Sequence, residues 1–330
     1  MSEQGQAGMR TPVITVTAPS RALVCGEGCE RFDEARFKRV SGRVRALGWE
    51  LRFTENVSTL CQRFAGDEKM RARCLMQAMK DPDTDLVMAL RGGYGATRIL
   101  SLLDWKSLAD YSAPLVGLSD VTALHLALLA KCGKPSWQGP TLSWFDHNNA
   151  QCDAAFMRAM QEERFTLSVP ADGDEFAAEG ILWGGNLSMI ESLVGTEYFP
   201  LISGGIFFFE DVAEPAWRVD RMLNHLADAG ILGRQKAIIA GSLRGVDKGA
   251  GEGDGRFALE HALDFIRQKT GLPVATGLPF GHIPETVTIP VGCQARAALS
   301  RGKLTIEVDE PPLPACAPGV DAARSAPWWA

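Results

Sequence analysis

Short apolar runs alternate with longer amphipathic segments through the first half of the chain. Four runs have the length and β-branched content of buried strands, at residues 13–16, 50–53, 85–90 and 114–116. Three segments have the apolar spacing of helices, at residues 32–47, 66–80 and 121–131. Strands that alternate with helices form parallel βαβ units, so this half is predicted to be a doubly wound α/β domain.

The second half has a different order of elements. Helices are predicted at residues 187–194, 215–229 and 256–269, and strands at residues 206–209, 236–240, 287–289, 295–299 and 304–308. The segment between the halves is more polar and less regular. We therefore predict four parts: an N-terminal α/β domain over residues 1–150, a linker over 151–180, a C-terminal domain with a small curled sheet over 181–310, and a loosely held Pro- and Ala-rich tail over 311–330.

Composition narrows the class of protein. The 330 residues carry a formal net charge of -6. Nucleic-acid binders rely on clustered Lys and Arg, so we expect no nucleic-acid partner. No apolar run approaches the ~20 residues of a membrane span. The first ten residues lack the basic and apolar regions of a secretory signal, so we expect a cytoplasmic protein. The eight cysteines are irregularly spaced, without a CxxC or a nearby His at zinc-ligand spacing, so no metal site is predicted.

Ser119 lies where an apolar strand gives way to an apolar helix. A turn at that point can expose a hydroxyl at the carboxyl edge of a parallel sheet, where open α/β folds bind their ligands. The amide of Asp120 would then lie beside the reacting carbon as an oxyanion donor. The alternative is a helix N-cap, since Ser is a favoured cap and the G-x-S-x-G signature is absent. Taken alone, this segment favours the cap.

A Gly-rich turn, RGGYG at residues 91–95, directly follows the third predicted strand. Its glycines let the backbone approach a ligand and direct N–H groups toward it. A phosphate-binding loop is the alternative function, but neither G-x-G-x-x-G nor the P-loop pattern is present. A plain tight turn also remains open.

A serine nucleophile needs a general base, usually a His that a carboxylate orients. Of the five histidines, His282 alone lies in a loop stiffened by two prolines, where functional residues are common. Glu210 follows the apolar run at residues 206–209, and a carboxylate there is costly to bury unless it is hydrogen-bonded. Asp211 and Glu214 are alternatives for the orienting acid.

Together these segments resemble the LD-carboxypeptidase family of serine peptidases. The matching segments, in the family's order, are APS at 18–20, FAGD at 64–67, RGGYGATR at 91–98, GLSD at 117–120, GGNL at 184–187, FEDV at 209–212 followed by Arg218 and RML at 221–223, and GLPFGH at 277–282. Each segment is short, but together they extend over residues 13–308.

The resemblance implies a flavodoxin-like N-terminal domain, a smaller β-rich C-terminal domain and a homodimer that needs no metal or other cofactor. It implies a catalytic triad of Ser119, Glu210 and His282. It also implies an oxyanion hole formed by the amides of Asp120 and Gly93, with Gly92 as the alternative to Gly93.

The implied reaction releases the terminal D-Ala from a muropeptide tetrapeptide during peptidoglycan recycling. A carboxypeptidase binds a free carboxylate, for which Arg is the natural partner. Arg91 opens the Gly-rich turn and is our first candidate, and Arg218 is the next. Tyr94 of the same turn is a further candidate contact.

Two alternatives stay open. A microcin-C-type immunity peptidase cleaves a peptide–nucleotide conjugate and would need an aromatic platform for the base, for which Trp183 and Trp144 are candidates. A non-catalytic muropeptide-binding protein would bind the peptide tightly without turnover.

Overall fold

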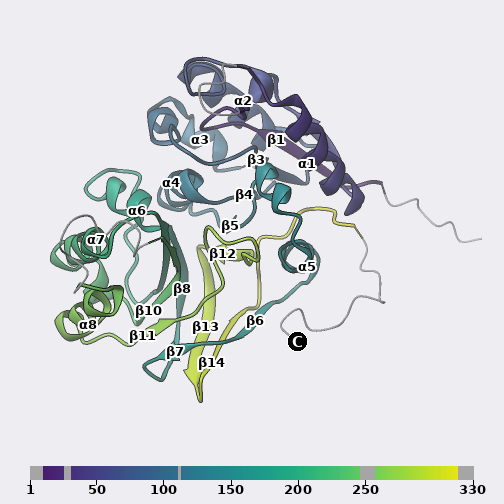
Figure 1. Cartoon of the computed structure of the whole chain (residues 1–330). Helices are drawn as coiled ribbons and strands as arrows, with labels where there is room; N and C mark the ends of the chain where they lie inside the picture. Colours follow the sequence, from purple (N-terminus) through teal and green to yellow (C-terminus); the bar gives the residue numbers. More distant parts are fainter. Residues whose placement is uncertain (1–9, 26–30, 111–112, 246–256, 319–330) are drawn as a thin grey trace, which may run out of the picture.

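The computed structural model describes residues 10–25, 31–110, 113–245 and 257–318. The described chain forms two sheets, each with helices against it, and Figure 1 shows the N-terminal layer (purple to blue) beside the C-terminal one (green and yellow). Among the described residues, no helix is both long and apolar enough to cross a membrane.

The first sheet carries five parallel strands in the order β2-β1-β3-β4-β5. Their bounds are β1 (Val13–Thr17), β2 (Glu50–Phe53), β3 (Leu86–Ala89), β4 (Leu115–Gly117) and β5 (Ser136–Gln138). This order is that of flavodoxin-like folds, so the predicted fold class of the N-terminal domain is confirmed.

The helices of this domain are α1 (Glu34–Ala46), α2 (Glu68–Lys80), the short α3 (Trp105–Leu108) and α4 (Thr122–Cys132), with 3-10 turns η1 (Glu55–Ser58), η2 (Thr97–Leu102), η3 (Ser119–Val121) and η4 (Leu142–His147). The carboxylates of Asp33 and Asp67 cap the first turns of α1 and α2 by accepting backbone N–H bonds. The sequence pattern thus placed these helices within two residues of their observed starts.

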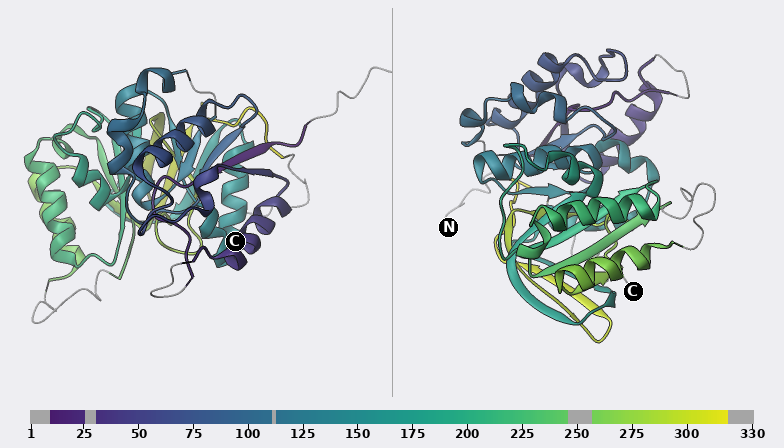
Figure 2. Two further views of the ribbon diagram at one scale, coloured as in Figure 1. Left: turned by 90° about the horizontal axis from the view of Figure 1, so that it is seen from above. Right: turned by 90° about the vertical axis from the view of Figure 1, so that its left-hand side faces the viewer.

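The second sheet has eight strands in the order β6-β14-β13-β8-β9-β10-β11-β7. The strands are β6 (Phe165–Pro170), β7 (Asp172–Gly173), β8 (Phe176–Asn186), β9 (Ile206–Val212), β10 (Ala237–Arg244), β11 (Val274–Thr276), β13 (Cys293–Ser300) and β14 (Lys303–Val308). β8 to β11 run parallel, whereas β6, β14, β13 and β8 pair antiparallel. The accompanying helices are α6 (Leu187–Leu193), α7 (Ala216–Asp228) and α8 (Leu259–Thr270), with the 3-10 turn η5 (Leu232–Arg234). In Figure 2, α7 and α8 lie together over one face of this sheet.

The predicted linker is structured. Residues 151–180 contain most of α5 (Ala150–Gln161), all of β6 and β7, and the start of β8. β6 alternates buried and exposed positions, with Phe165, Leu167 and Val169 turned inward. Its polar outward residues gave the segment the composition of a loop, and this is why the prediction is wrong.

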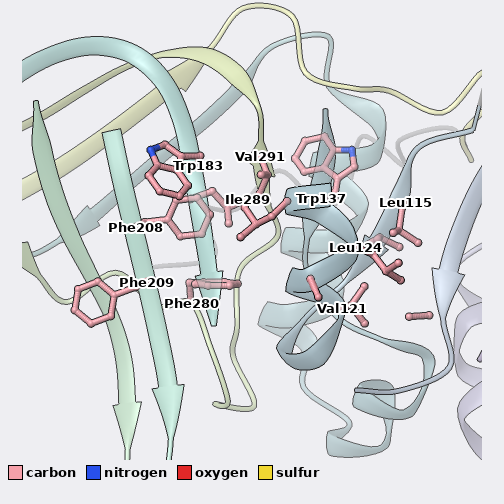
Figure 3. Packing of buried hydrophobic residues seen from close by; sticks show 14 of the residues in the cluster. Leu115, Val121, Leu124, Trp137, Trp183, Phe208, Phe209, Phe280, Ile289 and Val291 are labelled. Carbon is pink, nitrogen blue, oxygen red and sulfur yellow. The ribbon is translucent and has the colours of Figure 1, made fainter. Parts of the chain in front are cut away.

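The two layers share one continuous core. β12 (Ile289–Val291) leaves the C-terminal domain and pairs antiparallel with β5 at the edge of the first sheet, although the sequence placed this strand in the C-terminal sheet. Figure 3 shows Ile289 and Val291 between Trp183 and Phe208 on one side and Trp137 on the other. Packing across this seam fixes the two domains against each other.

The first part of the predicted tail is held in place. Trp137 Nε1 donates a 2.8 Å hydrogen bond to the carbonyl of Pro312, and Pro311 and Pro314 are buried. The prediction of a loose tail is therefore wrong for residues 311–318, while residues 319–330 lie outside the described chain.

Candidate active site

Ser119 has a left-handed backbone, with φ at 66°. It begins η3 directly after β4, and α4 follows from Thr122. Neither helix start has a side-chain cap hydrogen bond, so the N-cap interpretation of Ser119 is wrong. A left-handed non-glycine residue costs of order 1–3 kcal/mol and persists only where the surroundings impose it. A strained turn between a strand and a helix is also where α/β-hydrolases expose a nucleophilic serine.

The Gly-rich turn lies against Ser119. A Cβ on Gly92 would come within 2.8 Å of Ser119 Cβ and 3.1 Å of its Oγ. Gly93 has φ at 116°, a conformation that residues with a side chain rarely adopt. The backbone of this turn is therefore close enough to Ser119 to offer amides to a group bound at its hydroxyl.

The side chain of Asp120, next to Ser119, links the segments of Ser20 and Ala96 to the turn of the serine. Its buried Oδ2 accepts a 2.6 Å hydrogen bond from Ser20 Oγ and a 2.8 Å bond from the amide of Ala96. Burial raises the pKa of Asp120 above its ordinary value. Arg71, also fully buried, donates from one guanidinium nitrogen to the carbonyls of Pro19 (2.6 Å) and Gly95 (2.8 Å). These bonds fix the Gly-rich turn relative to Ser119.

Glu210 and His282 form a buried pair in the C-terminal domain. His282 Nδ1 donates to Glu210 Oε2 over 2.7 Å, and the Glu210 side chain is fully buried on β9. Gly281 is needed beside it, because a Cβ there would lie 2.8 Å from Glu210 Oε2. Of the acids weighed from the sequence, Glu210 is the one that contacts His282 in the described chain.

The charge of Glu210 controls the basicity of His282. Burial lowers the pKa of the imidazole, but the hydrogen bond and negative charge of Glu210 outweigh it, so the pKa of His282 is raised above its ordinary value. The carboxylate therefore holds the ring with a proton on Nδ1 and stabilises the imidazolium.

His282 faces the N-terminal domain through Trp144. The two rings meet edge-on at a centroid distance of 5.7 Å, and the amide of Ser143 is bonded to the carbonyl of Leu90, just before the Gly-rich turn. No hydrogen bond joins Ser119 and His282 in the described chain. Such bonds often tighten only when substrate is bound.

Positive charge gathers around the Gly-rich turn. Burial, together with the charges of Arg21, Arg36 and Arg63, lowers the pKa of Arg91 to about 10. The Arg91 Nε is buried without a hydrogen-bond partner, and Arg91, Arg21 and Arg63 have no carboxylate partner among the described residues. Uncompensated arginines at a site favour an anionic ligand.

The other predicted contacts differ in their placement. Tyr94 is exposed on the Gly-rich turn, with the Arg63 guanidinium 5.7 Å from its ring centroid. Arg218 is ion-paired with Glu214 at 2.9 Å. Trp183 is fully buried, and its Nε1 donates to Gln235. Trp183 therefore belongs to the core, and its prediction as a substrate contact is wrong.

Two site residues were missed from the sequence. Arg71 lies on the otherwise apolar face of α2 with Ala72 and Leu75. A charged residue on an apolar face is rarely buried without partners, so the sequence pattern could have indicated a specific role for Arg71. Asn186 donates to Glu210; its GGNL segment was among those matching the family, but no role was predicted for this residue. Within the described ranges, no cluster of three His, Cys, Asp or Glu residues is arranged to hold a metal.

Comparison with known proteins identifies the family of both domains. The profile of the LD-carboxypeptidase N-terminal domain matches residues 14–139, and that of the LD-carboxypeptidase C-terminal domain matches residues 179–297. A putative carboxypeptidase of Streptomyces coelicolor is 32% identical over 77% of this chain and 81% of its own length. A probable murein peptide carboxypeptidase of Bacillus subtilis is 28% identical over 81% of this chain and 84% of its own.

Solved structures are similar over almost the whole chain. The crystal structure of a muramoyltetrapeptide carboxypeptidase from Oxalobacter formigenes has a TM-score of 0.79 and 34% identity, covering 91% of this chain and 99% of its own. The structure of MccF in complex with glutamyl sulfamoyl guanosine has a TM-score of 0.80 at 21% identity, covering 92% of this chain and 97% of its own, and shares the fold.

Proposed function

Because the chain belongs to the LD-carboxypeptidase family, we propose that it is a cytoplasmic serine carboxypeptidase that removes the terminal D-Ala from muropeptide tetrapeptides. The scissile bond follows the L-centre of diaminopimelate, and the reaction belongs to peptidoglycan recycling. The observation that carries the serine mechanism is the left-handed conformation of Ser119 at the carboxyl end of β4. The names of the similar carboxypeptidases support the substrate.

In the first step, Ser119 Oγ attacks the carbonyl carbon of the scissile bond. His282 accepts the hydroxyl proton on Nε2, because its Nδ1 proton is held by Glu210. The amides of Asp120 and Gly93 stabilise the oxyanion of the tetrahedral intermediate, and losing one such donor typically costs about 3 kcal/mol.

Collapse of the intermediate breaks the C–N bond. The imidazolium of His282 donates its proton to the leaving nitrogen, and D-Ala departs with a neutral amine. A water molecule then attacks the acyl-enzyme ester, with His282 again taking the proton, and Ser119 is regenerated. No metal enters this scheme.

Arg91 is proposed to bind the free carboxylate of the terminal D-Ala. It opens the turn beside Ser119, it is half-buried, and its charge is uncompensated among the described residues. Arg21 and Arg63 add positive charge nearby, and Tyr94 lines the exposed side of the turn. Arg218 is the weaker candidate, because Glu214 already neutralises it.

The proposal is tested by incubating the protein with a purified muropeptide tetrapeptide and measuring free D-Ala. Release of D-Ala by the wild type but not by Ser119→Ala supports it. A microcin-type peptide–nucleotide conjugate serves as a second substrate, and preferential cleavage of the conjugate would replace the proposed substrate. Binding of the tetrapeptide without turnover would identify a sensor. The proposed homodimer is tested by measuring the mass in solution.

A further inference from the structure

The GGN segment, residues 184–186 at the end of β8, joins the two domains directly beside the site. The amide of Asn186 donates to Thr122 Oγ1 over 3.1 Å. Thr122 is the first residue of α4, three positions after Ser119. Gln138 on β5 donates to the same oxygen over 2.8 Å and to the carbonyl of Gly184 over 3.3 Å. The segment is therefore anchored to the helix that follows the nucleophile.

This close approach requires glycine at position 185. A Cβ on Gly185 would lie 2.1 Å from Gln138 Nε2 and 2.7 Å from Thr122 Oγ1, and its φ is 142°. A side chain there would displace the Gln138 amide and the Thr122 side chain that anchor the segment to α4. Gly185 thus lets the backbone of the C-terminal domain contact the first turn of α4.

The side chain of Asn186 reaches the other half of the site. Its Nδ2 donates to Glu210 Oε1 and to Asp211 Oδ1, each over 3.0 Å, while its Oδ1 accepts from the amide of Met189. Asn186 is 5% exposed, so water does not substitute freely for these bonds. The second oxygen of Glu210, Oε2, is the one that His282 uses.

A primary amide is well suited to this position. It carries two N–H donors, and it places one on each of two neighbouring buried carboxylates that would otherwise repel each other. A carboxylate at position 186 would add a third negative charge, and an alanine would leave Glu210 Oε1 without its donor.

We propose that Asn186 is a positioning residue for the reaction: it orients Glu210 toward His282 and ties this pair to the helix of Ser119 through Thr122. This inference rests on the proposed serine mechanism. In this proposal the GGN segment holds Ser119 of the N-terminal domain and the Glu210–His282 pair of the C-terminal domain at a fixed relative position.

The direct test is Asn186→Ala, with Gln235→Ala as the matched control. Gln235 is also a 5% exposed amide of the C-terminal domain, but it bonds Trp183 and backbone carbonyls away from the site. We expect kcat to fall roughly 10- to 100-fold in Asn186→Ala with little change in KM, as for loss of a hydrogen bond to a charged group. Gln235→Ala should keep kcat while losing comparable thermal stability.

A second readout does not depend on activity. The proton on His282 Nδ1, in a 2.7 Å bond to a carboxylate, should give a far-downfield proton resonance that His282→Ala abolishes. We expect Asn186→Ala to shift or broaden this signal and Gln235→Ala to leave it in place. If no substrate is ever cleaved, the proposed function fails but this measurement still decides the role of Asn186.

Thr122→Val provides a variant that preserves side-chain shape should Asn186→Ala not fold. It removes the acceptor that anchors Asn186 and should lower kcat in the same direction by a smaller factor. An Asn186→Ala or Thr122→Val protein with kcat within about threefold of the wild type and an unmoved resonance would overturn the inference.

Discussion

The indole of Trp144 meets the imidazole of His282 edge-on, with centroids 5.7 Å apart and planes at 80°. Trp144 belongs to η4 of the N-terminal domain, whereas His282 lies in a loop of the C-terminal domain. An aromatic side chain of the N-terminal domain therefore packs against the proposed general base of the C-terminal domain. We therefore expect Trp144 to help orient His282, a role that requires no nucleobase.

Removing the Trp144 side chain should leave the His282 imidazole less well oriented. We expect Trp144→Ala to lower kcat about 2- to 10-fold, because an aromatic pair of this geometry is worth ~0.5–1.5 kcal/mol. Trp144→Phe should retain most of the activity because it keeps an aromatic edge. Steady-state kinetics on the tetrapeptide would check this, and a loss confined to KM in Trp144→Ala would indicate a substrate contact instead.

Ser119→Ala and His282→Ala should each abolish turnover, and the double variant should be no worse than either single one. Residues that act as one unit typically show losses of roughly 10⁵- to 10⁶-fold that do not add. Hydrolysis and thermal unfolding of the three proteins provide the comparison. Substantial activity in Ser119→Ala would exclude the serine mechanism.

The backbone of Ser119 gives a separate prediction on stability. Because φ is 66°, Ser119→Gly should relieve strain that Ser119→Ala retains, and Ser119→Gly should be more stable by about 1 kcal/mol. Urea unfolding of the two inactive variants measures the difference. Equal stabilities would mean that the turn relaxes when the hydroxyl is absent.

The raised pKa of His282 sets the pH dependence of the reaction. The base must be neutral to accept the serine proton, so kcat/KM should rise with pH through an apparent pKa above the ordinary value of 6.5. Glu210→Gln removes the negative charge that raises the pKa of His282, while the burial that lowers this pKa remains. The acidic limb of the kcat/KM profile should therefore move to lower pH, and the maximal rate should fall. A limb that stays in place in Glu210→Gln would show that another group titrates.

Much of the N-terminal fold was predictable because its strands are buried on both faces and read as continuous apolar runs. β1, β3 and β4 are examples, with every residue buried. β6 was not predictable in the same way, because its outward positions are polar. The pairing of β12 with β5 depends on contacts about 150 residues apart, which local patterns do not encode.

The site was predictable to a similar extent. Residue type and local pattern raised Ser119, Glu210 and His282 as candidates among alternatives, and the family resemblance joined them as a triad. No local pattern could give the left-handed φ of Ser119 or the bond between Glu210 and His282 across 72 positions. The prediction for Trp183 failed because an apolar aromatic has the same local signature in a core as at a ligand.

His125 should make the protein sensitive to acid. It is fully buried on α4; its Nε2 donates to the carbonyl of Gly117 and its Nδ1 accepts from Ser136 Oγ. Burial lowers its pKa to about 4. Below about pH 6.5, His125 binds a proton in the unfolded chain but stays neutral in the folded one. The free energy of unfolding therefore falls as the pH drops toward 4.

The size of the His125 effect follows from the same values. Between about pH 7 and pH 5 the wild type should lose roughly 2 kcal/mol more stability than His125→Gln. Urea unfolding at both pH values tests this. Identical losses in the two proteins would mean that the histidine does not stay neutral in the fold.

The last prediction concerns how the substrate's C-terminus is recognised. Arg91 is half-buried at the start of the turn that lies against Ser119, and its Nε has no hydrogen-bond partner, a costly arrangement unless an anion completes it. Amidating the terminal D-Ala should therefore lower kcat/KM of the wild type by roughly 100-fold, since a charged hydrogen-bonded pair is broken. Arg91→Ala should start lower but lose much less on amidation. Arg98→Ala is the matched control, because Arg98 already pairs with Glu68 at 2.7 Å and should behave like the wild type. If the wild type and Arg91→Ala lose the same factor on amidation, Arg91 does not read the carboxylate, and the uncompensated charge of Arg21 becomes the next candidate.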